Sequence, residues 1–420
     1  MPHHHRPALL VLGAGDHIYR AFPLREFGAR HDLVLLDPQP PAWARPYVTD
    51  ALAVDLYDHQ AVTRAVTEIA LRQPLAGVTT YLEHHVELAA QLAKELGLPG
   101  TAPEAAAACR DKARTRQLLA EHSVPSARSV LVHSAEEAGA AADAIGYPVV
   151  IKPRGLGGSA GVRRADHREQ VIAAFHEAAD ATLIGLEKSA VAGVLVEEYL
   201  RGPEISVECV VRGRGDVHIA AVTRKQLGPE PAFLEEGHLV DADDPLLDDK
   251  PLRNVVTEAI KAVGITNGVL HVEVRLTGQG PRIIELNARL GGDLVPRLVH
   301  LATGVSLPQA QAALATGETP ELTASVRQSA AVEFRYPPAT GTVETARADA
   351  VSADWLERLV WTHQQGDVVT AGAHSTINDR VAHAVVWGPR PHDCRLRLAH
   401  VLQNLTVDIA APVRTTACVR

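Results

Sequence analysis

The chain has little of three things that mark common protein classes: cysteine, basic charge and long apolar runs. Its four cysteines lie far apart and form no C-x-x-C pair, which excludes a disulfide framework and a zinc ribbon and favours a reduced, cytoplasmic protein. Its net charge of -9 argues against a nucleic-acid-binding protein, because such proteins usually carry a basic excess. No apolar run approaches the roughly 18 residues of a membrane span, and no signal-peptide core precedes the first strand. We therefore expect neither nucleic acid nor membrane as a partner.

The length and the first residues indicate a multidomain α/β protein. A chain of 420 residues is long enough for two to four domains. A strand at 7–13, a helix and a second strand ending at Asp37 form a βαβ start. Gly13-Ala14-Gly15 follows the first strand, but Ile18 stands where a dinucleotide-binding motif needs its third glycine. An NAD-dependent oxidoreductase, with Asp37 on the ribose, stays an alternative that rests on this incomplete motif.

A glycine-rich hairpin occupies residues 147–164. The strand P-V-V-I-K-P contains Lys152, and the following loop contains Gly157, Gly158 and Ser159 before a return strand. Backbone N–H groups in such a loop can approach phosphates closely, and Lys152 adds a positive charge. The loop is not a P-loop, because the spacing G-x4-G-K-[ST] is absent. We therefore expect a phosphate-binding hairpin of another kind.

Acidic and apolar residues meet where a strand ends after residue 194. The strand ends in Glu197, Glu198, Tyr199 and Leu200. Such a segment can pair its backbone with an adenine edge while an acid accepts the amino group. Glu204, beyond the turn, is placed to hydrogen-bond a ribose. The alternative interpretation is a set of surface acids beside an edge strand.

The strongest pattern is a hairpin over 271–293, predicted as two strands joined by a loop of several residues, T-G-Q-G-P. Side chains alternate between the two faces of a strand, so Glu285, Asn287 and Arg289 share one face and Glu273 can face them from the partner strand. Two carboxylates and a carboxamide oxygen suit Mg²⁺, and Arg289 can hold a phosphate or carboxylate. The alternative is a solvated face of salt bridges.

Two further regions complete the sequence pattern. The residues 228–245 read as a long polar loop, with Lys225 just before it and His238 within it as candidate substrate contacts. Glu83 follows an earlier strand, at the edge where open α/β sheets place their ligands, and is a third candidate. The last ninety or so residues alternate short strands with one helix and contain no recognisable catalytic cluster.

Taken in order, these motifs resemble the ATP-grasp carboxylate–amine ligases over roughly residues 8–315. The resemblance rests on Asp111-Lys112, the glycine-rich hairpin, V-E-E-Y-L followed by G-P-E-I-S-V-E, and an E…E-x-N-x-R series. It implies an ATP-grasp fold, both α/β and α+β, in four parts. These are an N-terminal Rossmann-like domain at 1–100, a linker helix and glycine-rich lid at 101–190, a core with the Mg/ATP site at 191–320, and a small α+β domain at 325–420.

The resemblance also implies a role for each matching residue. Lys112 and Lys152 would contact ATP phosphates beside the glycine-rich loop. The segment from Glu197 to Leu200 would form the adenine hinge, and Glu204 would hold the ribose. Two Mg²⁺ ions, which Mn²⁺ can replace, would be bound by Glu273, Glu285 and Asn287. Arg289 and Lys152 would stabilise the reacting groups, and His271 or Glu83 would take the proton of the amine.

The end of the last motif resembles one branch of this family. The series N-A-R-L-G-G-D, with E-E-G-H at 235–238, is similar to the L-amino-acid ligases, which join amino acids or other amines, often in specialised metabolism such as antibiotic biosynthesis. Gly291 and Gly292 would then bind the substrate carboxylate. A biotin-carboxylase-like or purine-biosynthesis-like carboxylating enzyme and a non-catalytic nucleotide-binding module stay open. The absence of V-x-V-E-H after N-x-R argues against biotin carboxylase. The expected partners are small molecules, with a homodimer as the common default.

Overall fold

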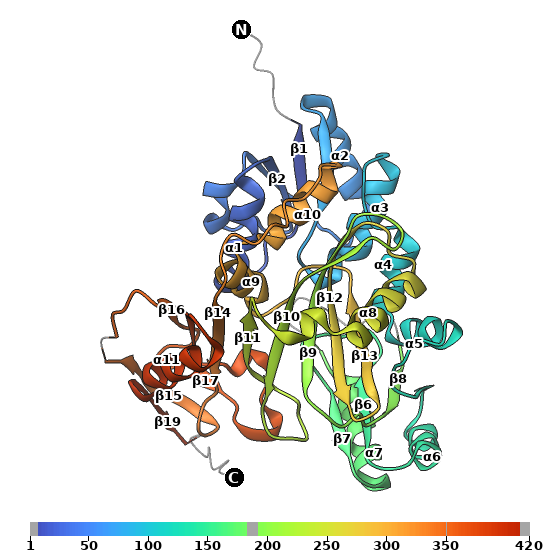
Figure 1. Ribbon diagram of the computed structural model, residues 1–420, viewed down its shortest axis with the longest axis vertical. Helices are drawn as coiled ribbons and strands as arrows, with labels where there is room; N and C mark the ends of the chain where they lie inside the picture. The colour runs from blue at the N-terminus through green and yellow to red at the C-terminus, as the bar shows by residue number, and fades with distance from the viewer. Residues whose placement is uncertain (1–6, 183–191, 350, 412–420) are drawn as a thin grey trace, which may run out of the picture.

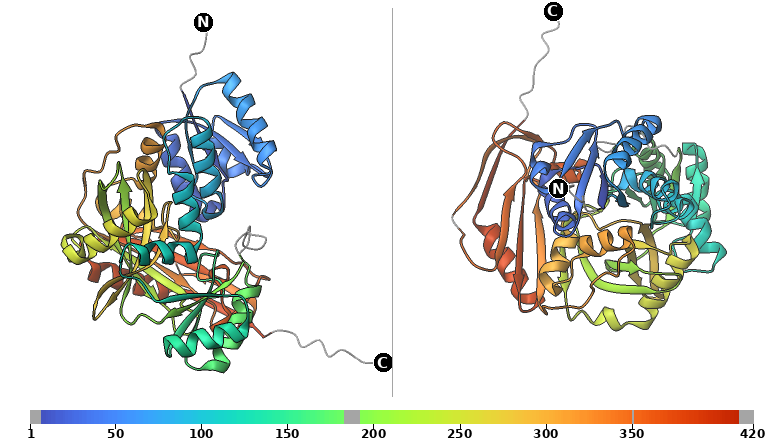
Figure 2. Two further views of the ribbon diagram at one scale, coloured as in Figure 1. Left: turned by 90° about the vertical axis from the view of Figure 1, so that its right-hand side faces the viewer. Right: turned by 90° about the horizontal axis from the view of Figure 1, so that it is seen from above.

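The computed structural model describes residues 7–182, 192–349 and 351–411. The boundary expected near residue 190 and the cysteine at position 418 lie outside these ranges. Figure 1 shows the N-terminal strands at one end of the molecule, and the views in Figure 2 place the sheet that contains β6 and β7 at the other. The C-terminal segment, coloured red in Figure 1, lies on the left of the molecule in that view. None of the helices in the described ranges is both long and apolar enough to cross a membrane.

The N-terminal sheet is parallel, as the βαβ pattern predicts, and has the order β3-β2-β1-β4. Its strands are β1 (Ala8–Leu12), β2 (Asp32–Asp37), β3 (Asp50–Ala53) and β4 (Leu75–Thr79), and its helices are α1 (His17–Gly28), α2 (His59–Arg72) and α3 (Val86–Glu95). Every residue of β1 is buried, because helices cover both faces of a parallel sheet. A late helix, α10 (Leu307–Thr316), packs on β4, and a Cβ at Gly77 would lie 2.4 Å from the Ala315 carbonyl oxygen.

A second, antiparallel sheet has the order β5-β8-β6-β7 and carries the glycine-rich loop. Its strands are β5 (Ser129–Val132), β6 (Val149–Pro153), β7 (Arg163–Ala165) and β8 (Val194–Glu198). Two helices, α6 (Ala135–Ile145) and α7 (Arg168–Asp180), pack on it and on each other, and form a small separate core with its strands. The loop between β6 and β7 is therefore held on a sheet with its own core.

The central sheet has eight antiparallel strands in the order β13-β12-β9-β10-β11-β14-β18-β16. The strands are β9 (Glu204–Val211), β10 (Val217–Leu227), β11 (Glu235–Asp241), β12 (Gly268–Thr277), β13 (Gly280–Asn287), β14 (Ser329–Arg335), β16 (Leu356–Trp361) and β18 (Ala382–Gly388). The amphipathic α8 (Lys250–Val263) packs on β13, and α9 (Val295–Thr303) packs on β11 and β14. The sheet is continuous from the predicted core into the last hundred residues.

The remaining elements connect these layers. Residues 318–328 contain no helix or strand, as expected of a linker. A three-stranded sheet joins β17 (Val368–Val369), β15 (Gly341–Ala348) and β19 (Leu405–Ala410), and α11 (Pro391–Gln403) covers β14 and β18. The linker helix expected at the start of the 101–190 part is two helices, α4 (Pro103–Arg110) and α5 (Lys112–Glu121), because Asp111 leaves helical geometry and caps α5.

Two expectations from the sequence are wrong. Residues 235–241 of the predicted polar loop form β11 inside the central sheet, because backbone pairing to β10 and β14 on both sides holds the acidic segment extended. The hairpin loop expected after residue 276 is a tight turn, because Thr277 pairs with Gly280 and leaves two residues between them. Gly280 has a φ of 105°, which its lack of a side chain permits.

Candidate functional site

One pocket holds most of the side chains that the sequence singles out. It has a volume of about 920 Å³, opens to solvent, and lies between β12 and β13 on one side and β6 and β8 on the other. The predicted residues that line it are Lys112, Lys152, Gly157, Gly158, Ser159, Glu197, Glu198, Tyr199, Leu200, Glu204, Glu273, Glu285, Asn287 and Arg289. The remaining candidates lie outside its lining: Glu83, Lys225, His238, His271, Gly291 and Gly292.

The pairing of β12 with β13 places the predicted metal ligands together. Glu273 lies opposite Glu285, and His271 lies opposite Asn287. The register shifts by one residue beyond Glu273, and this extra residue lets Ile283 and Leu286 reach the core while Glu285 and Asn287 line the pocket. The shared face predicted from strand alternation is therefore present in the structure.

The donor set at this face fits a divalent cation that prefers oxygen. Oε1 of Glu273 forms ion pairs with Lys225, at 3.0 Å, and with His271, at 3.4 Å. Glu285 uses Oε1 for Lys112, at 3.1 Å. Among the described residues, none donates a hydrogen bond to the second oxygen of either carboxylate. With its amide turned so that the nitrogen faces these acids, Asn287 donates to Glu285 and to Glu83, each at 3.2 Å. Free carboxylate oxygens on one pocket wall are ligands that Mg²⁺ prefers.

The two predicted phosphate lysines approach the pocket from different elements. Lys112 opens α5, where its ammonium donates to the Leu156 carbonyl at 2.5 Å as well as pairing with Glu285. Lys152, on β6, pairs with Glu197 at 2.6 Å. Both lysine side chains are buried. Their charges therefore face the pocket from fixed positions instead of moving freely in solvent.

Glu197 does not have the free carboxylate that the predicted adenine contact needs. Arg116, on α5, donates to both of its oxygens, at 2.7 Å and 3.0 Å, and Lys152 holds one of them. Burial opposes ionisation of Glu197, but Arg116 and Lys152 lower its pKa to about 2. The carboxylate therefore positions Lys152, and only the backbone of this segment stays available to an adenine edge. No local pattern in the sequence points to Arg116, which lies 81 residues away from Glu197.

Lys225 is a structural cation behind the pocket wall. Its buried ammonium pairs with Glu204 at 3.0 Å, Glu235 at 2.7 Å and Glu273 at 3.0 Å. Burial disfavours this charge, but Glu235, Glu273 and Glu204 raise the pKa of Lys225 well above its usual value. Because three carboxylates occupy its three donors, Lys225 positions a predicted metal ligand and the predicted ribose contact. Glu204 also accepts from Arg275 at 2.6 Å.

The geometry opposes both predicted acceptors of the amine proton. His271 contacts Glu208 at 3.0 Å, and although burial lowers its pKa, Glu208 and Glu273 raise it to about 9. Glu83 forms ion pairs with Arg110 and Arg289. Burial raises the pKa of Glu83, but Arg289 and Arg110 lower it to about 2. A protonated imidazole and a strongly paired carboxylate are both weak bases at neutral pH.

The glycines predicted to contact the nucleotide or the substrate differ in how much free space surrounds their backbone. A Cβ at Gly157 or at Gly292 would meet nothing within 4 Å, so the backbone is accessible at both positions. A Cβ at Gly291 would lie 2.9 Å from Nδ1 of His271, so this glycine allows close packing. In the glycine-rich loop, Gly158 and Ser159 have φ values of 62° and 56°, and the Ser159 hydroxyl donates to the Phe233 carbonyl at 3.2 Å.

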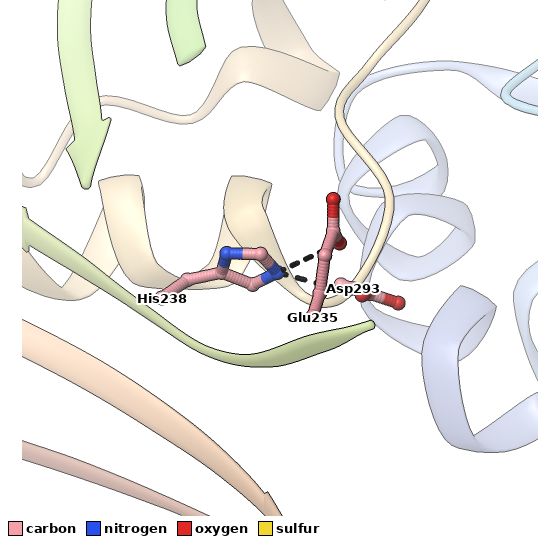
Figure 3. A group of neighbouring side chains, drawn as sticks. All are labelled: Glu235, His238 and Asp293. Carbon is pink, nitrogen blue, oxygen red and sulfur yellow. Dashed lines mark hydrogen bonds and ion pairs between the residues drawn. The ribbon is translucent and has the colours of Figure 1, made fainter. Parts of the chain in front are cut away.

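Beyond Arg289, His238 lies between two acids. Its Nε2 is 3.3 Å from Glu235 and 3.4 Å from Asp293, and Figure 3 shows both acids converging on this nitrogen. Burial lowers the pKa of His238, but Asp293 and Glu235 together raise it. Arg380, on the segment before β18, donates to both oxygens of Asp293. The cluster is thus balanced by cations, with Lys225 on Glu235 and Arg380 on Asp293.

Comparison with known proteins gives matches over most of the chain. An ATP-grasp domain matches residues 145–297, and an ATP-grasp N-terminal domain matches residues 31–100. An uncharacterized protein, y4rH, of Sinorhizobium fredii is 32% identical over 66% of this chain and 56% of its own length. Human carnosine synthase 1 is 26% identical over 95% of this chain and 50% of its own length. The chain therefore spans about half the length of these curated relatives.

The structure of an L-amino acid ligase from Bacillus licheniformis superimposes with a TM-score of 0.81 at 20% identity. The superposition covers 97% of this chain and 100% of that one. The predicted multidomain fold is confirmed by this likeness and by the two domain matches.

Proposed function

Because the chain belongs to the ATP-grasp superfamily, we propose that it is an ATP-dependent ligase that activates the carboxylate of an amino acid as an acyl phosphate and joins it to an amine. The observation that carries this proposal is the single pocket in which Lys112 and Lys152 face the free oxygens of Glu273 and Glu285. Fixed cations at one wall and cation-binding oxygens at another are the parts that phosphoryl transfer needs.

The nucleotide occupies the pocket with its two ends on different walls. The backbone from Glu198 to Leu200 faces the adenine edge, and Glu204 faces the ribose. Lys112, Lys152 and the loop at 157–159 face the phosphates. All of these residues line one continuous pocket, in which charged side chains and accessible backbone converge as in small-molecule sites.

The chain's own residues have distinct parts in the reaction. Mg²⁺ at Glu273, Glu285 and Asn287 would neutralise charge on the terminal phosphates of ATP. Arg289 orients the substrate carboxylate so that its oxygen attacks the γ-phosphate and ADP leaves. The neutral amine then attacks the acyl carbon, the C–N bond forms, the bond to the phosphate oxygen breaks, and the departing phosphate takes the proton that the amine loses. Lys152, fixed by Glu197, and Arg289 offset the charge that develops.

The residues that end the last motif favour amino acids as the substrate class. The series from Arg289 to Asp293 and the E-E-G-H segment resemble the L-amino-acid ligases, and two proteins similar to this chain are an L-amino acid ligase and a carnosine synthase. We further propose Mg²⁺ as the metal, with Mn²⁺ as a substitute, two ions per site, and cytoplasmic action on small molecules as a homodimer. A specialised pathway such as antibiotic biosynthesis would suit this chemistry.

The test is a screen of ADP release over pairs of amino acids, with the mass of each product determined. We expect one or more pairs to release ADP and to give a product lighter than the sum of the two substrates by one water. The Glu285→Gln variant is the negative control for contaminating ATPases. ADP release without a condensed product across the whole screen would remove the ligase assignment.

A further inference from the structure

Three potential metal ligands converge beside the pocket assigned to the nucleotide. Glu235, His238 and Asp293 each offer one ligand atom, and these atoms lie within 4.8 Å of one another. Figure 3 shows both carboxylates beside the same imidazole nitrogen. The side chain of His238 is only 1% exposed, whereas those of Glu235 and Asp293 are 20% and 17% exposed. Glu235 also lines the nucleotide pocket, so the cluster can be reached from there.

A bulge in β11 makes this arrangement possible. Glu235 and His238 are three residues apart, so in a regular strand their side chains would point to opposite faces. The register with β10 shifts between them, and Glu236 is the extra residue. The bulge therefore turns Glu235 to the face that His238 occupies. Asp293 reaches the same nitrogen from the loop after β13.

The contacts of His238 Nε2 have the lengths expected around a tetrahedral metal ion. This nitrogen lies 3.3 Å from Glu235 Oε2 and 3.4 Å from Asp293 Oδ2. A charge-assisted N–H···O hydrogen bond is usually about 2.7–2.9 Å long, and one N–H cannot be linear to both oxygens. Two ligands that each lie about 2.0–2.2 Å from a tetrahedral Zn²⁺ are roughly 3.3–3.6 Å apart. The spacing therefore suits an ion better than a shared proton.

The imidazole of His238 is fixed before any ion binds. Its ring packs edge-on against Phe334, with 5.9 Å between the ring centroids. Its other nitrogen, Nδ1, is buried and has no hydrogen-bond partner in the part of the chain that the structure describes. Nε2 is therefore the nitrogen that is available to a ligand, and it points between the two carboxylates.

The cations beside the two acids leave oxygen lone pairs for an ion. Lys225 pairs with Oε1 of Glu235 at 2.7 Å, and among the described residues only His238 pairs with Oε2. Arg380 uses one lone pair of Asp293 Oδ2, at 2.7 Å, and a carboxylate oxygen has two. Lys225 and Arg380 therefore hold the two acids in position, as outer partners of metal ligands do.

We propose that Glu235, His238 and Asp293 bind one Zn²⁺ ion, separate from the Mg²⁺ of the nucleotide. One imidazole nitrogen and two carboxylate oxygens suit Zn²⁺, whereas Mg²⁺ prefers an octahedron of oxygen ligands. Three protein ligands leave the fourth position of a tetrahedral ion open. The ion would tie β11 to the loop after β13 and offer this fourth position to a molecule in the nucleotide pocket.

Binding of the ion is measured in excess Mg²⁺ and without nucleotide, so the result does not depend on the ligase reaction. The background protein carries His3→Gln, His4→Gln and His5→Gln, because three adjacent histidines are a competing metal site. Co²⁺ is the spectroscopic probe, since a tetrahedral Co²⁺ ion absorbs visible light much more strongly than an octahedral one. Zn²⁺ is then titrated against the bound Co²⁺.

We expect one Co²⁺ per chain with a tetrahedral spectrum, displaced by an equal amount of Zn²⁺. His238→Gln should weaken Zn²⁺ binding by about 100-fold or more, the upper end of what loss of an outer partner costs. Zn²⁺ should also raise the melting temperature of the background protein and not that of His238→Gln. Glu235→Gln, which keeps the shape of the side chain, gives the same test if His238→Gln does not fold. His392→Gln, an exposed substitution on α11, should leave the affinity unchanged.

A background protein that binds no Co²⁺, or that gives the spectrum of an octahedral ion, would overturn the proposal. Zn²⁺ affinities that stay unchanged in both His238→Gln and Glu235→Gln would also overturn it. Failure of the amino-acid ligase screen would not alter these readouts, so the metal site and the proposed function are tested separately.

Discussion

Arg380 holds Asp293 through two hydrogen bonds, of 2.8 Å and 2.7 Å, although the two residues lie 87 positions apart in the chain. The guanidinium also donates to the Glu235 carbonyl and to the Tyr336 hydroxyl, both at 3.1 Å. Asp293 has a φ of 47°, a left-handed conformation that is unfavourable for a residue with a side chain. The C-terminal region therefore fixes the loop that follows the predicted metal ligands.

Arg380→Ala should destabilise the protein by about 3–5 kcal/mol, because it leaves the Asp293 carboxylate without its buried partner. Chemical unfolding measures this loss. The double variant Arg380→Met with Asp293→Asn should lose clearly less than the sum of the single variants, since no unpaired charge remains. Arg347→Ala, which breaks an exposed pair with Asp349, should cost no more than about 1 kcal/mol. Equal losses for Arg380→Ala and Arg347→Ala would show that the buried pair is not stabilising.

Glu285→Gln should lower the rate of ADP formation at least about 100-fold while the protein still folds. The substitution keeps the shape of the side chain and removes the charge that would hold Mg²⁺ and that pairs with Lys112. Steady-state ADP release and thermal unfolding are measured on the same preparation. Glu258→Gln, on the exposed face of α8, is the matched control. Near-normal turnover in Glu285→Gln would remove the metal assignment.

Arg289→Ala should lose product formation by about 100-fold or more while nucleotide affinity changes little. Arg289 pairs with Glu83 and lines the pocket at the end where the carboxylate reacts. Calorimetric titration with a non-hydrolysable ATP analogue gives the affinity, and single-turnover kinetics give the chemical step. The reverse pattern, with weak binding and intact chemistry, contradicts the predicted role.

Glu197→Ala should destabilise the protein by about 3–5 kcal/mol, because Arg116 and Lys152 would both lose their buried partner. Glu198→Ala, on the same strand, breaks only partly exposed pairs with Arg128 and Arg282 and should cost about 1 kcal/mol or less. Urea unfolding of both variants gives the comparison. A similar, small loss in the two variants would mean that Glu197 is not the anchor of this network.

His383 should make the folded protein less stable as the pH falls. Burial, together with Arg358 and Arg380, lowers its pKa to about 3, below the ordinary value of 6.5. Between these values the unfolded chain binds a proton that the folded protein does not. The contribution of His383 is therefore complete above pH 6.5 and declines by at most about 1.4 kcal/mol per pH unit below it.

His383→Gln should make the free energy of unfolding fall less steeply with decreasing pH, because it removes one of the groups that cause this fall. His85, whose pKa burial and His84 lower to about 3, would still contribute in the same direction. Free energies of unfolding measured from pH 7.5 to pH 5 give the two slopes. His392→Gln, an exposed substitution on α11, controls for the loss of a histidine. Parallel slopes in wild type and His383→Gln would contradict the buried neutral state of His383.

The parts of the site that follow local rules could be predicted from the sequence. The period of two along a strand places Glu285 and Asn287 on one face, and the turn at 278–279 brings Glu273 opposite them. The glycine-rich hairpin and its lysine are contiguous in the chain. The parallel N-terminal sheet follows from buried strands that alternate with helices. In each case the information lies within one or two neighbouring elements.

The parts that depend on distant pairing could not be predicted. Arg380 and Arg116 have no motif around them, and their roles come from the residues that folding brings to them. The strand β11 is too acidic to read as a buried strand, and it is held by backbone pairing on both sides and by Lys225 against Glu235. The proton acceptors His271 and Glu83 stay predictions, and the sequence alone could not reveal their partners, which are Glu208 for His271 and both Arg110 and Arg289 for Glu83.

The continuity of the central sheet has a consequence for any shortened version of the protein. A chain cut in the linker at 318–328 would lose β14, and β11 would become the outermost strand. Its unpaired backbone groups would then be a template for pairing with other molecules. Truncated proteins that lack the last hundred residues should therefore aggregate, even though every residue lining the nucleotide pocket is still present.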